Sequence, residues 1–308
     1  MAAYMRLHYT PGEFQRAGTP RRTGWFAASS RCATTYRPEW RRGVFAERGP
    51  SAPWVRFAGP GPASPPDIEE VGVLSIGAKL MGVPGSKLLD DERFTQDFMG
   101  ISAPDLHHAR TSGRTRSCRP ASLKGTPLFY FIQPVRLASP GRDHAGRLWA
   151  RTQTSPFETA YWGCAPYLLG EGRAMQYSFR PALADPEPRA PPAAAPPDHY
   201  LRETMAATLA RGRTSSSTFS VQLQTDAHRM PHRERVECAG PNGCRARCRS
   251  RPCGCRASGS TRRRASSRFA HNLSINPWHC VPEHRPLGNQ NRARQQTCYG
   301  ELSGSGNP

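Results

Sequence analysis

Five cysteines lie close together between positions 238 and 255 and form the densest group of side chains that could ligate a metal. They are half of the ten cysteines in the chain: Cys238, Cys244, Cys248, Cys253 and Cys255. Thiolates bind structural zinc mostly through pairs of the form C-x2-C. The spacing here is C-x5-C-x3-C-x4-C-x-C, which contains no such pair. The spacing therefore argues against a zinc site.

A second group of reactive side chains is formed by Arg294, Cys298 and Tyr299. On a helix, residues four apart share a face, so Arg294 would lie beside Cys298 and lower the pKa of its thiol. Tyr299 would be rotated by about 100° from that face, because a helical turn takes ~3.6 residues. A phenol has a pKa near ~10, so it becomes a good anionic ligand only where a cation stabilises the phenolate.

The charge of the chain is strongly positive, with 43 Lys and Arg against 23 Asp and Glu and a formal net charge of +20. Eleven arginines and two glutamates lie between positions 232 and 268, where Val236 is the one large apolar residue. Such a stretch binds polyanions in a salt-dependent way, but without interleaved aromatic residues it offers bases no stacking platform. Nucleic-acid binding is therefore an alternative function, and it would be non-specific.

The secondary-structure elements that must position these residues are predicted to be both strands and helices, so the fold class is α+β. Alternating or short apolar runs predict strands within 54–82 and at 127–132, 173–180 and 218–225. Leu201, Met205 and Leu209 recur every four residues and predict a helix over 200–210, capped by Asp198. Residues 181–197 are rich in proline and are expected to form an extended linker.

Three of the histidines outside these elements, His107, His108 and His279, are expected to face solvent. No run of about 18 apolar residues is present, and residues 1–22 lack an apolar signal segment. These observations favour a cytoplasmic chain that does not cross a membrane.

Short segments along the chain, taken in order, resemble the catalase superfamily, in particular its smaller bacterial members. They cover roughly half of the chain. The similar segments are V-R-F at 55–57, Ile76–Gly82, Phe94–Phe98, Ser102–Pro104, Pro166–Gly170, Arg173–Tyr177, Val221–Thr225, Asn276–Trp278, Glu283–Gly288 and Asn291–Arg294 followed by Tyr299.

The resemblance implies one domain over 1–308, folded as a closed antiparallel β-barrel with flanking helices and an interior wide enough for a ligand. It implies a heme cofactor and a catalase- or peroxidase-like reaction with hydrogen peroxide or an organic peroxide. Tyr299 would ligate the heme iron, with Arg294 stabilising its phenolate and Cys298 as the other candidate ligand. Arg56 would pair with a heme propionate.

The groups that the family uses to move the peroxide proton are missing. The distal histidine is expected between positions 22 and 37, where the sequence has no histidine. Ala58 stands where the family has a serine, and Ile101 and Ser102 stand in the region of its asparagine. Loss of proton transfer lowers the rate of that step by roughly 10² to 10⁴, so impaired peroxide turnover is expected.

Three stretches depart from the family pattern: 20–37, 105–120 and 231–268. Asp-Leu-His-His-Ala-Arg at 105–110 becomes Thr-Phe-Thr-Thr-Pro when a possible coding sequence is read one base later, which restores an aromatic residue. The Arg, Cys, Ser and Gly bias of 231–268 is typical of GC-rich DNA read in a wrong frame. These stretches are therefore expected to be disordered or out of frame, in a degenerate relative of a catalase.

Overall fold

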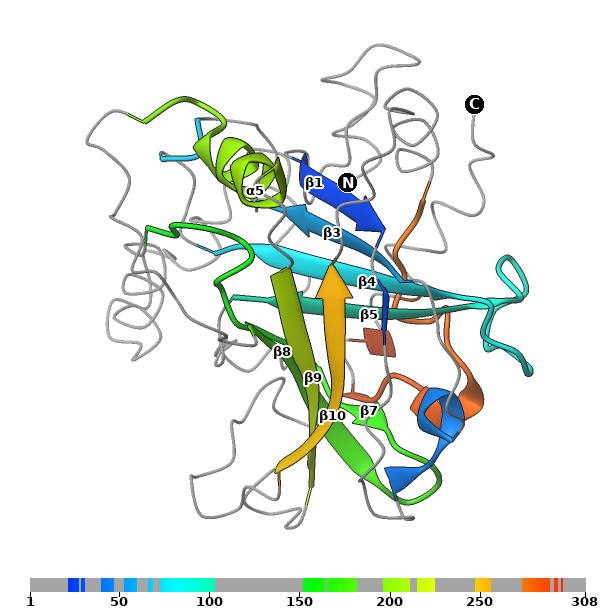
Figure 1. Cartoon of the computed structure of the whole chain (residues 1–308). Coiled ribbons are helices and arrows are strands. Elements are labelled where there is room, and N and C mark those ends of the chain that lie inside the picture. Colours follow the sequence, from blue (N-terminus) through cyan, green and yellow to red (C-terminus); the bar gives the residue numbers. More distant parts are fainter. Residues whose placement is uncertain are drawn as a thin grey trace, which may run out of the picture.

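The computed structural model describes the parts of the chain that build one antiparallel sheet and the segments packed on it (Figure 1). For the strands at 22–27, 29–30 and 247–255 the structure describes the backbone and not the side chains. The described residues are 22–27, 29–30, 40–46, 53–59, 66–68, 73–102, 152–163, 165–181, 196–210, 215–224, 247–255, 273–288, 291–292 and 295.

The sheet has ten strands in the order β1-β3-β4-β5-β6-β8-β9-β10-β2, with β7 paired to β8, and it curls into a half-barrel (Figure 1). Every pairing is antiparallel. A single residue separates β1 from β2, which begin and end this path. The strands are β1 (Arg22–Ala27), β2 (Ser29–Ser30), β3 (Trp54–Ala58), β4 (Ser75–Met81), β5 (Thr95–Ile101), β6 (Tyr161–Trp162), β7 (Tyr167–Leu168), β8 (Ala174–Pro181), β9 (Ser215–Leu223) and β10 (Arg247–Cys255).

The strands predicted within 54–82 and at 173–180 and 218–225 are confirmed as β3, β4, β8 and β9. The strand predicted at 127–132 lies outside the described residues. Two stretches expected to lack regular structure contribute strands instead: 20–37 holds β1 and β2, and 231–268 holds β10. Ladder hydrogen bonds join backbone groups, so a free strand edge can pair with a segment that lacks an apolar pattern.

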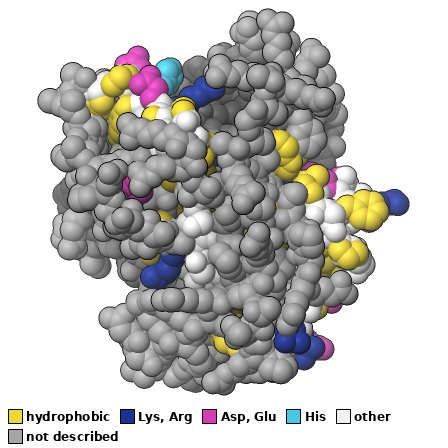
Figure 2. Space-filling model, in the orientation of Figure 1, with side chains coloured by type: hydrophobic (Ala, Val, Ile, Leu, Met, Phe, Trp, Pro, Cys, Tyr) yellow, Lys and Arg dark blue, Asp and Glu magenta, His cyan; other side chains and the backbone are white. Residues whose placement is uncertain are grey.

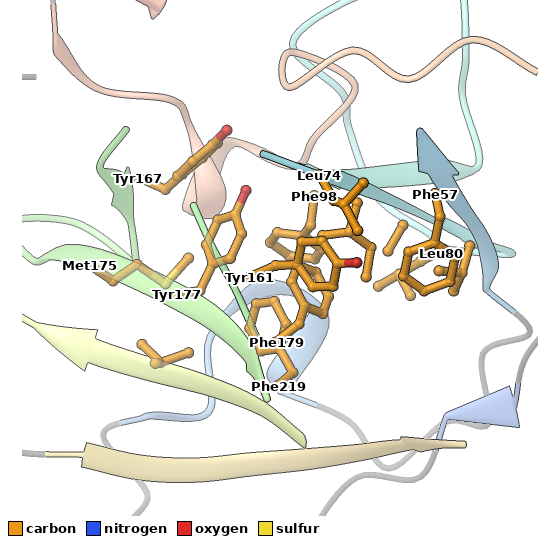
Figure 3. Packing of buried hydrophobic residues seen from close by; sticks show 14 of the residues in the cluster. Phe57, Leu74, Leu80, Phe98, Tyr161, Tyr167, Met175, Tyr177, Phe179 and Phe219 are labelled. Atoms are coloured by element: carbon orange, nitrogen blue, oxygen red, sulfur yellow. The ribbon is translucent and has the colours of Figure 1, made fainter. Parts of the chain in front are cut away.

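The inner face of the half-barrel is filled by aromatic and aliphatic side chains (Figure 3). Phe219 on β9 lies at the centre, with its ring centroid 5.0 Å from Phe98, 5.2 Å from Tyr177 and 5.2 Å from Phe179. Edge-to-face and offset contacts at such separations are the favourable geometries of aromatic pairs. The expectation of an interior wide enough for a ligand is therefore wrong for the described part of the sheet. Side chains alternate along each strand, and the bulky ones that point inward meet one another there.

The Tyr177 hydroxyl joins β8 to β5 where the sheet has few ladder bonds. Between β5 and β6 the register holds one pair, Ile101 with Trp162. The Tyr177 hydroxyl donates to the Met99 carbonyl at 2.7 Å and accepts from the Met99 N–H at 2.9 Å. One side chain thus satisfies both backbone groups of a strand residue that a neighbouring strand would otherwise pair.

Replacing Tyr177 with phenylalanine is expected to lower the free energy of unfolding by about 1–3 kcal/mol, because it leaves the part-buried N–H and C=O of Met99 without their hydrogen-bond partner. Urea unfolding of the full chain measures the change. Phe179→Leu, on the same strand, is a matched control that loses packing but no hydrogen bond. If Tyr177→Phe has no effect on stability, the hydroxyl is not a substitute for strand pairing.

The α-helix that the structure describes over its whole length is α5 (Tyr200–Ala210), which has the bounds expected from the sequence. Its buried residues are Tyr200, Leu201 and Met205, and it lies near β1 (Figure 1). The Leu201 N–H of its first turn donates to the carboxylate of Asp67 at 2.9 Å. A cap from far upstream in the chain thus supports a helix for which the sequence suggested Asp198.

Two short 3-10 helices complete the regular structure of the described residues, η2 (Gly43–Phe45) and η5 (Pro282–His284). The connection between β4 and β5, residues 82–94, projects from the body, and hydrophobic, Lys or Arg side chains gather on it (Figures 1 and 2). Phe94 there is 68% exposed. None of the helices in the described residues is long and apolar enough to span a membrane.

Candidate functional site

Arg56 of β3 is buried on the face of the sheet that points away from the aromatic core. Its neighbours along the strand, Val55 and Phe57, belong to that core, so alternation turns Arg56 and Ala58 to the opposite face. We call this the outer face of β3, β4 and β5. Arg56 is 8% exposed there, and burying a guanidinium is costly unless its charge is paired.

Ala58 and Ser102, two of the positions where the family resemblance would place proton-transfer groups, take part in hydrogen bonds that stabilise the fold. The cross-strand partner of Ala58 is Ser75, whose hydroxyl donates to the Ala58 carbonyl at 3.0 Å. Ser102 is buried, and its hydroxyl accepts from the Leu74 N–H at 2.8 Å. Neither hydroxyl is an acid–base group near neutral pH, so neither replaces an imidazole.

The segment expected to carry a distal histidine does lie beside Arg56. β1 pairs with β3, and the residue opposite Arg56 is Trp25. The register shifts between Arg22 and Gly24, which marks a bulge or irregularity next to Ala58. This segment therefore lies next to β3, and its sequence contains no histidine.

A buried ion pair occupies the outer face two residues along β4 from the position opposite Arg56. Lys79 on β4 and Asp97 on β5 are cross-strand partners, and both are fully buried. The Lys79 Nζ lies 2.9 Å from the Asp97 Oδ2 and also donates to the Glu92 carboxylate. Opposite charges directly across a ladder stabilise the register.

Residues 273–281 cover this ion pair. The Asn276 N–H donates to the Asp97 Oδ2 at 2.9 Å, and the Ser274 hydroxyl donates to the Glu92 Oε1 at 3.0 Å. The Ile275 side chain lies against Gly77 of β4, where a Cβ would collide with it. The glycine thus permits the close approach of the segment to the sheet.

His279 is buried between carboxylates, and the expectation that it faces solvent is wrong. It is 1% exposed, with its Nδ1 3.2 Å from the Asp97 Oδ2 and its Nε2 2.8 Å from the Asp91 Oδ2. The partners come from residues more than 180 positions upstream. Lys79 is a charged residue within the otherwise apolar segment Ile76–Met81. This is the sequence signal that could have indicated a buried polar cluster here.

The charges of the cluster shift one another's pKa values. Burial alone would lower the pKa of His279, but hydrogen bonds and charges from Asp97, Asp91 and Glu92 outweigh it and raise that pKa above its usual value. Burial raises the pKa of Asp97, opposed by its contacts with His279, Lys79 and the Asn276 N–H. Burial would likewise raise the pKa of Glu92, but hydrogen bonds from Lys79 and Thr95 hold it below its usual value.

Glu92, Asp97 and His279 have ligand atoms close enough together to hold a metal ion. The place of a cation between the two carboxylates is, however, taken by the Lys79 ammonium. A bound metal would also require His279 to be neutral, whereas its two carboxylate partners favour the protonated ring. We therefore assign these residues to an ion-pair network and not to a metal centre.

A second buried histidine, His284 of η5, joins three segments. Its Nε2 accepts from the Val44 N–H at 3.1 Å, and its Nδ1 donates to the Leu168 carbonyl at 3.2 Å. Burial lowers the pKa of His284 to about 4. Gly43 has φ +52°, and a Cβ there would lie 2.5 Å from the His284 Nε2. Neutral His284 thus holds η2 and β7 against η5.

Comparison with solved structures decides the fold of this sheet. A fungal catalase matches 98% of the chain with a TM-score of 0.62 and 13% sequence identity. Catalase A from Saccharomyces cerevisiae matches 98% of the chain with a TM-score of 0.65 and 14% identity. The chain has a catalase-like fold. It spans about 60% of the length of these two catalases, since it covers 60% of one and 62% of the other.

The similarity lies in the structure and is faint in the sequence. No protein-family model matches the chain, and no curated protein matches it. At 13–14% identity to two catalases, the shared fold does not by itself show which residues of this chain do chemistry.

Of the residues expected to hold a cofactor in this catalase-like fold, Arg56 is described and is buried on the outer face of β3. Arg294, Cys298 and Tyr299 lie outside the described residues. Their described neighbour Asn291 is fully buried, and its carbonyl accepts from the Trp278 indole N–H at 3.1 Å. The chain that leads to Arg294 is therefore tied to the segment that covers β4 and β5.

Proposed function

We propose that this chain is a catalase-like heme protein that reacts with hydrogen peroxide or an organic peroxide, with impaired turnover. The observation that carries the proposal is the catalase-like fold across 98% of the chain. Heme, when bound, supplies the iron at which peroxide is decomposed. The proposal includes closure of the barrel, which is supported by the single residue between β1 and β2 at the two ends of the strand path.

Arg56 is proposed to hold a heme propionate. A guanidinium forms bidentate pairs with carboxylates, and Arg56 is buried on the face of β3 that the aromatic core leaves free. Because the ring contacts around Phe219 occupy the inner face, the macrocycle is proposed to lie on the outer face, beside Arg56. The residues present thus fit the carboxylate end of a heme.

Tyr299 is proposed as the ligand of the heme iron, with Arg294 stabilising its phenolate and Cys298 as the other candidate. Asn291 begins this stretch, and its attachment to Trp278 places it next to the outer face. The i and i+4 relation favours Cys298 as the neighbour of Arg294, and the resemblance to the family favours Tyr299.

Peroxide turnover is proposed to be impaired because the positions expected to carry the proton shuttle hold residues that cannot act as one. Ala58, Ile101 and Ser102 carry no group that titrates near neutral pH, and the sequence of β1 has no histidine. Such a loss lowers the rate by roughly 10² to 10⁴. Peroxide turnover would therefore be slow even when heme is bound.

Reconstitution with hemin tests the heme proposal. The purified full chain is expected to give a Soret band with the features of a tyrosinate ligand. Tyr299→Phe should abolish heme retention, and Cys298→Ala should leave it intact. Arg56→Gln should weaken retention without changing the ligand signature, because it touches the propionate and not the iron.

The opposite result for the two ligand variants would identify Cys298 as a thiolate ligand. If neither substitution changes the spectrum, heme is bound elsewhere or not at all, and the catalase-like fold reflects ancestry alone. A mobility shift with random DNA that weakens with salt, in a protein without a Soret band, would support the alternative function in nucleic-acid binding.

The departures from the family pattern are proposed to be out of frame or degenerate. Residues 105–120 lie outside the described residues, and so does most of 231–268. Resequencing of the locus tests this idea. A reading frame that is intact and shared by close relatives with the same Arg- and Cys-rich stretches would refute it.

A further inference from the structure

Residues 273–281 are attached to the outer face by two kinds of contact. One kind does not depend on pH near neutrality: the Asp97 N–H donates to the His279 carbonyl at 2.9 Å, and the Val281 N–H donates to the Gln96 Oε1 at 3.0 Å. The other kind is the contact of the His279 ring with carboxylates. The second kind can change with the protonation of one group.

The geometry of His279 favours the doubly protonated ring. Both ring nitrogens face carboxylate oxygens, Nδ1 at 3.2 Å from Asp97 and Nε2 at 2.8 Å from Asp91. An ionised carboxylate only accepts hydrogen bonds, so both nitrogens must carry a proton for both contacts to form. A neutral ring would turn one lone pair toward an anion and lose that contact.

We propose that His279 is a pH-dependent latch, which in its protonated form bridges Asp97 and Asp91 and holds residues 273–281 on the outer face. Loss of the proton loosens this segment without unfolding the sheet. The latch is a property of the chain alone, so it does not depend on whether heme binds.

The charges around the ring explain why the proton is held. Three carboxylates face it, from β5 (Asp97) and from the 82–94 connection (Asp91 and Glu92, the latter 3.4 Å from Nδ1). Lys79 of β4 is the one described cation in contact with two of them. The carboxylates therefore outnumber the lysine, and protonated His279 brings the cluster closer to neutrality.

The direction of the pH dependence follows from the raised pKa of His279. A histidine whose pKa is higher in the folded state contributes its stabilisation below the unfolded value of about 6.5 and loses it as pH rises through the folded value. The latch is thus closed at pH 6 and opens in the alkaline direction. In acid the carboxylates protonate instead, so the test stays at pH 6 and above.

Cys280 reports on the latch because it is next to His279 and is itself fully buried. Burial raises the pKa of its thiol to about 12, so the thiol reacts slowly while the segment is docked. Trypsin releases it in a peptide, 269–292, that contains no other cysteine, since Arg285 precedes a proline. Its alkylation can therefore be followed separately from the other nine cysteines.

The experiment measures N-ethylmaleimide labelling of Cys280 in the full chain from pH 6 to pH 9, divided at each pH by the rate in urea-unfolded protein. This ratio removes the intrinsic pH dependence of the thiol. The protection of Cys280 is expected to fall by about tenfold across this range, the loss of one charge-assisted hydrogen bond. His279→Gln, which cannot titrate, should show low protection at pH 6 and little change with pH.

Asp91→Asn is the variant that keeps the core intact, because the Asp91 side chain is 57% exposed. It removes one anion from Nε2, so the pH at which protection falls should shift downward. Glu158→Gln, at an exposed carboxylate outside the cluster, should leave the midpoint unchanged. Protection that does not vary with pH in the natural chain, or a midpoint that Asp91→Asn does not move, would overturn the latch.

Discussion

Lys79→Met is expected to lower the free energy of unfolding by about 3–5 kcal/mol, because it leaves Asp97 as a buried charge without its ammonium partner. Lys79 on β4 and Asp97 on β5 are both fully buried. The Glu92 carboxylate loses a hydrogen bond in the same step. Urea unfolding, followed by circular dichroism, measures the change in midpoint.

Two variants separate the charge from the packing of Lys79. Lys87→Met changes a partly exposed lysine in the 82–94 connection and should alter stability by no more than about 0.5 kcal/mol. The double variant Lys79→Met with Asp97→Asn removes both charges, keeps an oxygen that can accept from the Asn276 N–H, and should recover part of the lost stability. A double variant as unstable as Lys79→Met alone would show that packing, and not the unpaired charge, causes the loss.

Acid is expected to destabilise the fold through protonation of His284, and the loss of stability is nearly as large as that expected for Lys79→Met. Burial lowers the pKa of His284 to about 4, so the folded state resists its protonation. The stability that neutral His284 contributes is fully present above the unfolded value of about 6.5 and is lost as pH falls toward 4, which amounts to about 3 kcal/mol. A proton on Nε2 would face the Val44 N–H, a donor, and open the contact between η5 and η2.

The measurement is the urea midpoint between pH 7 and pH 4, in the natural chain and in variants without this titration. His284→Gln and His284→Asn each keep one of the two hydrogen bonds, so at least one of them should fold. Carboxylates titrate in this range in all three proteins, and the difference between the curves isolates the histidine. If the natural chain and the variants lose stability in parallel, His284 is not the acid-sensitive group.

Local patterns explain the parts of the fold that the sequence predicts correctly. Alternation of side chains along β8 and β9 and the four-residue recurrence in α5 record which face of each element is buried. The V-R-F segment likewise indicates a strand, but that Arg56 is buried between two core residues of that strand is seen only in the structure. Each of these signals sits within one element.

The candidate site is less predictable because its members are distant in the chain. His279 and Asp97 are 182 residues apart, and no sequence pattern around His279 indicates that Asp97 is its partner. The Tyr177 hydroxyl reaches Met99 across 78 residues in the same way. Such contacts exist only after the sheet has curled, so residue type and local spacing do not reveal them.

The sequence by itself determines the strands β3, β4, β8 and β9, the helix α5 and the resemblance to catalases, since all of these follow from the order and periodicity of residue types. Only the tertiary structure decides that the inner face is closed by aromatic rings, that β10 joins the sheet, and that His279 is buried between carboxylates. The physical reason is the same in each case. Packing, backbone pairing and a pKa depend on which groups the fold brings within a few ångströms, and that is a property of the whole chain.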